Sequence, residues 1–115
     1  MKIFVPTRTG ILLTASATVG VAIGRLDIID TKFLEGMGCV KPHPHFNFFR
    51  VASSNFCQVL FTNSDTELAT KDDYLVCPYD GNQVIAVQKS IKFISIRGQV
   101  ANQTVSIKQG EYVEV

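Results

Sequence analysis

Residues 90–115 read SIKFISIRGQVANQTVSIKQGEYVEV, and their pattern of side chains indicates an all-β fold. Two runs in it, 90–97 and 103–108, alternate apolar and polar side chains, which is typical of a β-strand with one buried face. Gly98 and the pair Ala101–Asn102 favour a turn between these runs. Gln109 and Gly110 favour a further turn, so a last strand is expected over residues 111–115.

The rest of the chain repeats this pattern of short strands separated by turn residues. Further strands are expected over residues 2–5, 11–15, 18–23, 26–29, 45–52, 56–62, 74–77 and 84–87. No stretch holds the sustained 3.6-residue period of a crossover helix, and Gly36 and Gly38 limit residues 31–37 to one turn. The expected fold is therefore all-β, an antiparallel β-sandwich or jelly-roll-like barrel, in a single domain over residues 1–115.

Alternation within the strands predicts which side chains form the core. The expected core residues are Phe46, Phe48, Val59, Phe61, Ile91, Phe93, Val105 and Ile107. A hairpin turn is expected at residues 53–55, between the strands on either side. Several strands are apolar on both faces, as at Phe48–Phe49 and Phe93–Ile94. A two-layer sandwich hides only one face of each sheet, so the surplus apolar face is expected to meet other subunits.

The apolar outer faces and the two chain ends are thus the expected interaction surfaces. Residues 2–5 and 111–115 are β-rich and terminal, which suits them to act as arms that add to the edge of a partner sheet. The expected interface residues are Lys2, Ile3, Phe4, Val5, Phe49, Leu60, Ile94, Tyr112, Val113 and Val115. Contacts of this kind predict a homo-oligomer or a larger assembly.

Composition and charge narrow the classes of function. Hydrophobic residues make up 46% and charged residues 18% of the chain, which is too apolar for a disordered protein. The net charge of +1 comes without a cluster of cations, so sequence-specific nucleic-acid binding is not expected. Residues 10–24 are too short and too polar to predict a membrane span or a signal peptide. The three cysteines are expected to be free thiols in a reducing compartment.

Residues 46–50 combine aromatic side chains with an arginine, which leaves single-stranded nucleic-acid binding as an alternative. Phe46, Phe48 and Phe49 with Arg50 would form a stacking face for a single strand, although core packing is the simpler interpretation. A second alternative is a small-ligand or carbohydrate-binding module that stacks its ligand on Tyr74, Tyr79 or Phe49. The chain contains no tryptophan, which weakens that alternative.

Cys39, His43 and His45 form the only group with metal-ligand character. Two histidines separated by one residue share a face of a strand, as in the first motif of cupins, which this segment resembles. The chain departs from that motif because residues 47–54 contain no glutamate and no third histidine exists. Neither a nucleophile elbow nor a phosphate loop is present in the sequence. No metal, no other cofactor and no enzymatic activity are therefore expected, with a cupin-like metal protein as the less favoured alternative.

The last third of the chain has a recurring order of turns and strands. Asp80–Gly81 is followed by β-rich runs over 84–87, 91–98 and 104–107, and then by Gly110. Over about residues 79–112 this order resembles the closing strands of small β-sandwich virion proteins of tailed bacteriophages, which decorate or stabilise the head or sit in the tail. The resemblance implies a capsid accessory subunit of the decoration or cement type that binds the major capsid protein or other virion proteins. It also implies assembly in the host cytoplasm and residence in the virion.

Overall fold

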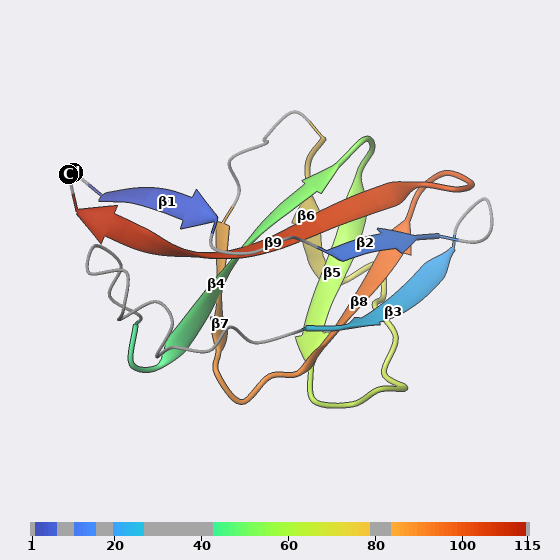
Figure 1. Cartoon of the computed structure of the whole chain (residues 1–115). Coiled ribbons are helices and arrows are strands. Elements are labelled where there is room, and N and C mark those ends of the chain that lie inside the picture. The colour runs from blue at the N-terminus through green and yellow to red at the C-terminus, as the bar shows by residue number, and fades with distance from the viewer. Residues whose placement is uncertain (1, 7–10, 16–19, 27–42, 79–83, 115) are drawn as a thin grey trace.

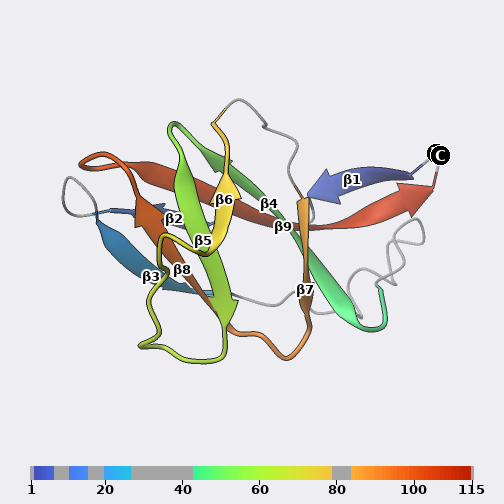
Figure 2. The same ribbon diagram turned by 180° about the vertical axis from the view of Figure 1, so that it is seen from behind.

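The computed structural model consists of two antiparallel sheets that pack face to face (Figures 1 and 2). It describes residues 2–6, 11–15, 20–26, 43–78 and 84–114, and no helix occurs among them. The strands are β1 (Lys2–Pro6), β2 (Ile11–Thr14), β3 (Val21–Arg25), β4 (Phe46–Ser53), β5 (Cys57–Thr62), β6 (Tyr74–Val76), β7 (Val84–Gln88), β8 (Phe93–Gly98) and β9 (Thr104–Glu114). The protein is therefore an all-β antiparallel sandwich, as its sequence predicts.

Strand β9 organises the five-stranded sheet, in which the order is β1-β9-β4-β7 and β2 also pairs with β9. β1 and β2 share one edge of β9, where β2 lies along its first half and β1 along its second half. β4 occupies the other edge of β9. The four-stranded sheet has the order β3-β8-β5-β6.

The chain changes sheets between β4 and β5, so the expected hairpin at residues 53–55 is wrong. β4 pairs with β7 and β9, whereas β5 pairs with β6 and β8 in the other layer. Small polar turn residues allow either geometry, and long-range pairing decides between them. The turn expected at Ala101–Asn102 is present, and Asn102 adopts the left-handed conformation there with a φ of 56°.

The core lies between the layers, where Phe49 of β4 stacks on Phe61 of β5 with ring centroids 5.8 Å apart. The other large core residues include Val51, Val59, Val76, Val87, Ile94, Ile96, Val105 and Ile107. Leu13 of β2 reaches across to β3, where a Cβ built on Gly24 would lie 2.5 Å from Leu13 Cδ2. Glycine at this position therefore lets the two sheets approach closely.

In β4 and β8 the face that packs into the core is the opposite of the one expected. Phe49 and Ile94, expected on the outside as interface residues, are 3% and 0% exposed. The pairing gives the reason, because Phe49 lies opposite Gln109 and Ile94 lies opposite Phe61, both on inward positions. Phe46, Phe48 and Phe93 were expected in the core, and they are only partly buried on the outer faces. Val59, Phe61, Val105 and Ile107 lie on the inner faces as predicted.

Strand β9 runs without a break through Gln109 and Gly110, so the turn expected there is wrong. Gly110 lies between Pro6 of β1 and Phe48 of β4, and pairing on both edges keeps this part of the strand extended. The two terminal segments expected as free arms also pair with each other, since Lys2 lies opposite Glu114 and Val5 opposite Glu111. One edge of each segment is thus paired within the protomer, while β1 is an edge strand of its sheet and the pairing of β4 with β9 ends at Gly110.

The outer face of the four-stranded sheet is partly covered by residues 63–73, which link β5 to β6 and cross in front of it in Figure 2. The backbone N–H of Ala69 donates to Ser95 Oγ at 2.9 Å, and Ser95 is fully buried. Ala69 itself is 4% exposed. This sheet therefore receives cover from its own chain.

Candidate interaction surface

Aromatic side chains gather on the outer face of the five-stranded sheet, where β1, β9 and β4 lie side by side (Figure 1). Phe4 lies directly opposite Tyr112, and their ring centroids are 6.0 Å apart. Phe48 packs on Tyr112 from the other side in a T-shaped arrangement, with ring centroids 5.0 Å apart. We call this surface the aromatic face, and its residues are Phe4, His43, Phe46, Phe48, Arg50 and Tyr112.

Local sequence explains why these side chains share a face. Phe46, Phe48 and Arg50 alternate along β4, so all three project away from the core. Gly110 lies opposite Phe48 on β9 and has no side chain, which leaves room for the rings of Phe48 and Tyr112 to meet. Phe46, Phe48 and Arg50 therefore share a face as the stacking interpretation requires, whereas Phe49 lies on the other side of the strand.

Arg50 gives the aromatic face a positive charge. Its guanidinium carbon lies 5.0 Å from the centroid of the Phe4 ring, a cation–π arrangement. Its Nε atom is buried and has no hydrogen-bond partner. Lys108 of β9 lies directly opposite Arg50 in the strand register. Two like charges therefore stand side by side on this sheet.

His43 holds the start of β4 in place. Its Nδ1 accepts hydrogen bonds from the backbone N–H groups of His45 at 3.1 Å and Phe46 at 3.2 Å. The ring also lies 5.2 Å from the ring of Phe46 and 5.8 Å from that of Phe48. Nδ1 is thus occupied as an acceptor, and the imidazole joins the aromatic face.

The expected metal candidates are only partly brought together. The rings of His43 and His45 lie 6.0 Å apart, and Cys39 lies outside the described residues. Among the side chains that the structure describes, no three or more histidine, cysteine or acidic residues form a group able to hold a metal ion. Cys57 and Cys77 are both free cysteines. Cys57 is buried, which raises the pKa of its thiol, and Cys77 is exposed.

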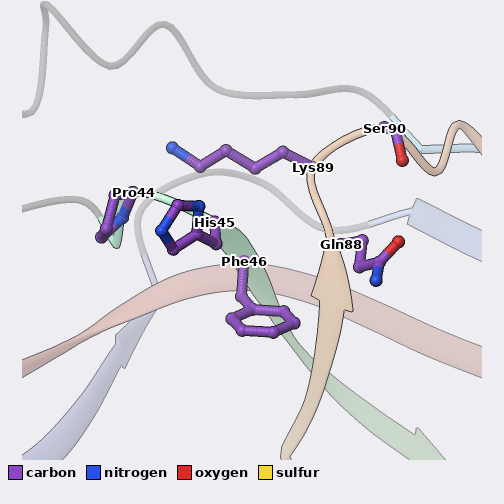
Figure 3. Close-up of a pocket in the computed structure, with 6 residues that line it drawn as sticks. All are labelled: Pro44, His45, Phe46, Gln88, Lys89 and Ser90. Atoms are coloured by element: carbon purple, nitrogen blue, oxygen red, sulfur yellow. The ribbon is translucent and has the colours of Figure 1, made fainter.

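A shallow recess of about 440 Å³ lies beside the aromatic face, between the start of β4 and the end of β7. Its lining residues are Pro44, His45, Phe46, Gln88, Lys89 and Ser90. Figure 3 shows Lys89 extending toward His45, while Gln88 and Ser90 lie on the far side of β7. The polar groups of the recess therefore do not converge on one point.

Buried polar residues line the inner side of the same sheet, and sequence reasoning missed them. Asn47, Gln109 and Glu111 are 3%, 5% and 3% exposed. Burial raises the pKa of the Glu111 carboxyl, and the backbone N–H of His43 and the charge of Lys89 only partly offset this effect. For Gln109 and Glu111 the sequence does contain a signal. The alternation that points residues 105 and 107 of β9 inward also points 109 and 111 inward.

The remaining expected site residues are scattered. Tyr74 is 53% exposed on β6 and Phe49 is in the core, so these two share no stacking platform, and Tyr79 lies outside the described residues. Leu60 is partly buried on the outer face of the four-stranded sheet. The backbones of Lys2, Ile3, Val5 and Val113 belong to β1 and β9, and Val115 lies outside the described residues.

A scan against protein-family models, a search of curated proteins and a search of solved structures each find no match for this chain. Among the described residues, no helix is long and apolar enough to cross a membrane.

Proposed function

We propose that this chain is a non-enzymatic structural subunit that binds another protein subunit through its aromatic face. The observation that carries the proposal is the cluster of Phe4, Phe48 and Tyr112 on an outer sheet face, with Arg50 over the Phe4 ring. Tyr112 is 39% exposed, and Leu12 on the same sheet is 68% exposed. Aromatic residues and arginine are the residue types that dominate the binding energy of protein interfaces.

Energetics favour a partner over solvent at this surface. Water leaves the apolar edges of the Phe4, Phe48 and Tyr112 rings when a partner covers them, which is favourable by about 25 cal/mol per Å². The Nε of Arg50 is buried without a hydrogen bond in the protomer, and the partly buried guanidinium would gain a charge-assisted hydrogen bond from an acceptor on a partner. A well-packed interface of about 1,600 Å² in total is sufficient for stable binding.

The resemblance of residues 79–112 to small virion proteins of tailed bacteriophages suggests which assembly the chain joins. We propose that the chain is a capsid accessory subunit of the decoration or cement type, and that its partner is the major capsid protein or another virion protein. Assembly takes place in the host cytoplasm, and the mature location is the virion. Neither a cofactor nor a membrane takes part.

The test is co-purification of the chain with particles from its natural source. We expect the chain to remain with purified particles at moderate salt, and the double variant Phe48→Ala/Tyr112→Ala to dissociate from them. Because both residues lie on the outer face, the variant should still fold. Circular dichroism and a thermal melt check that it does. Absence of the chain from particles, or undiminished binding by the folded variant, would refute the proposal.

The second candidate is a small-ligand or carbohydrate-binding module, which the recess beside His45 and Lys89 favours. An aromatic wall at Phe46 and two cationic or hydrogen-bonding groups suit an anionic or hydroxyl-rich ligand. A glycan array and a thermal-shift screen test this alternative. A specific ligand whose binding is lost in Lys89→Ala would favour it over the assembly function.

A further inference from the structure

The loop over residues 63–73, which we call the acidic loop, lies on the opposite side of the sandwich from the aromatic face. It contains four carboxylates and one lysine. Asp65 and Asp72 are exposed, and Leu68 between them is 52% exposed. The acidic loop therefore presents an apolar side chain flanked by negative charges.

Internal hydrogen bonds brace the acidic loop. Thr62 Oγ1 donates to Glu67 Oε2 at 2.6 Å, and Ser64 Oγ accepts from the backbone N–H groups of Thr66 and Glu67, both at 3.2 Å. Ala69 is fixed to Ser95 of β8. A braced loop loses little conformational entropy when it binds, which favours its use as a docking element.

The aromatic face has the complementary charge. Arg50 and Lys108 lie directly opposite each other on β4 and β9, and like charges in directly opposite positions destabilise a sheet. An anion supplied from outside would relieve the repulsion and offer an acceptor to Arg50.

We propose that the aromatic face of one copy binds the acidic loop of a second copy. Leu68 contacts the rings of Phe48 and Tyr112, and the loop carboxylates neutralise Arg50 and Lys108. This inference rests on the proposed function, because it names the occupant of the same surface. Charge complementarity and an exposed apolar side chain on each partner surface carry it.

The placement of the two surfaces dictates the form of the assembly. Because they lie on opposite faces of the sandwich, each copy binds one neighbour through its aromatic face and another through its acidic loop. Such a heterologous contact does not close at two subunits, and it generates a ring or a filament. The chain should therefore form species larger than a dimer as its concentration rises through the micromolar range.

The first test is Lys108→Glu, measured by sedimentation velocity. Within the protomer the new carboxylate stands opposite Arg50, so the melting temperature should be unchanged or higher. Between protomers it faces the acidic loop, and association should weaken by roughly tenfold or more. The matched control is Lys108→Arg, which keeps a positive charge at the same exposed position on β9 and should leave association unchanged. Equal weakening by both variants would overturn the inference.

The second test mixes two variants, each of which has lost one surface. Lys108→Glu retains a normal acidic loop, and Leu68→Glu retains a normal aromatic face. Each alone should be monomeric, and their mixture should give a 1:1 dimer by native mass spectrometry and nothing larger. No dimer in the mixture, or a wild-type chain that forms only a symmetric dimer, would overturn the head-to-tail contact.

The outcomes also separate this inference from the proposed function. A wild-type chain that is monomeric in solution yet co-purifies with particles overturns the contact between copies and leaves docking to another virion protein in place. A chain that forms head-to-tail oligomers but is absent from particles supports the contact and refutes the virion role.

Discussion

Phe48 and Phe49 are neighbours in β4, yet alanine at each position should have very different effects on the free energy of unfolding. Phe49 is 3% exposed and stacks on Phe61 at 5.8 Å. Removing a buried phenylalanine side chain costs about 3–5 kcal/mol, because the transfer energy is lost and a cavity remains. Phe48 is partly buried and contacts Tyr112 and His43 at ring distances of 5.0 and 5.8 Å. Aromatic pairs contribute about 0.5–1.5 kcal/mol each, so the loss of two pairs in Phe48→Ala should cost about 1–3 kcal/mol.

Urea denaturation followed by circular dichroism measures this difference. A gap of about 2 kcal/mol at an m-value of about 2 kcal/mol/M separates the midpoints of the two variants by about 1 M. The protein should be dilute enough that association between copies makes no contribution to stability. A larger loss for Phe48→Ala than for Phe49→Ala would show that β4 presents its other face to the core, and the aromatic face would not exist as described.

Three further predictions concern single side chains. Gln103 is 2% exposed and donates through Nε2 to Ser53 Oγ and to two turn carbonyls. Gln103→Ala should therefore lower the free energy of unfolding, measured in urea, by about 3 kcal/mol. A loss below about 0.5 kcal/mol, the scale of surface substitutions, would contradict a structural role for these hydrogen bonds. The pKa of Glu111 is raised in the fold above its ordinary value of 4.5, so the free energy of unfolding should fall as pH rises from that value through the folded pKa. Glu111→Gln should remove this pH dependence. A variant with the same pH profile as the wild type would refute the assignment to Glu111. Maleimide should label exposed Cys77 rapidly and buried Cys57 only on unfolding, as peptide mass spectrometry would reveal, and equal labelling rates would contradict the fold.

Periodicity predicted the inward face correctly only where one face of a strand is clearly polar. In β9, Thr104, Ser106 and Lys108 alternate with Val105 and Ile107, which leaves one choice of face. β4 has apolar residues on both faces, and its inward Asn47 resembles a solvent-exposed position. Its orientation is decided by pairing with β9, a partner far away in the sequence.

The candidate surface was predictable in its parts and not in its grouping. Phe4 and Tyr112 were expected interface residues, and both belong to the aromatic face. Their association with Phe48 and Arg50 depends on the position of β9 between β1 and β4, which no local pattern encodes. The same holds for the change of sheet after β4, because turn residues do not specify which layer the next strand joins.

Photo-cross-linking from the aromatic face measures whether a partner covers it. Tyr112→p-benzoylphenylalanine places a photoreactive group at a position that is 39% exposed in the protomer. The same group at exposed Ser54, in the turn after β4, serves as the control. In concentrated protein or in purified particles, position 112 should cross-link efficiently to a second polypeptide, and position 54 should not. Recovery of only uncross-linked protomer from position 112 would contradict the claim that this face is covered by a partner.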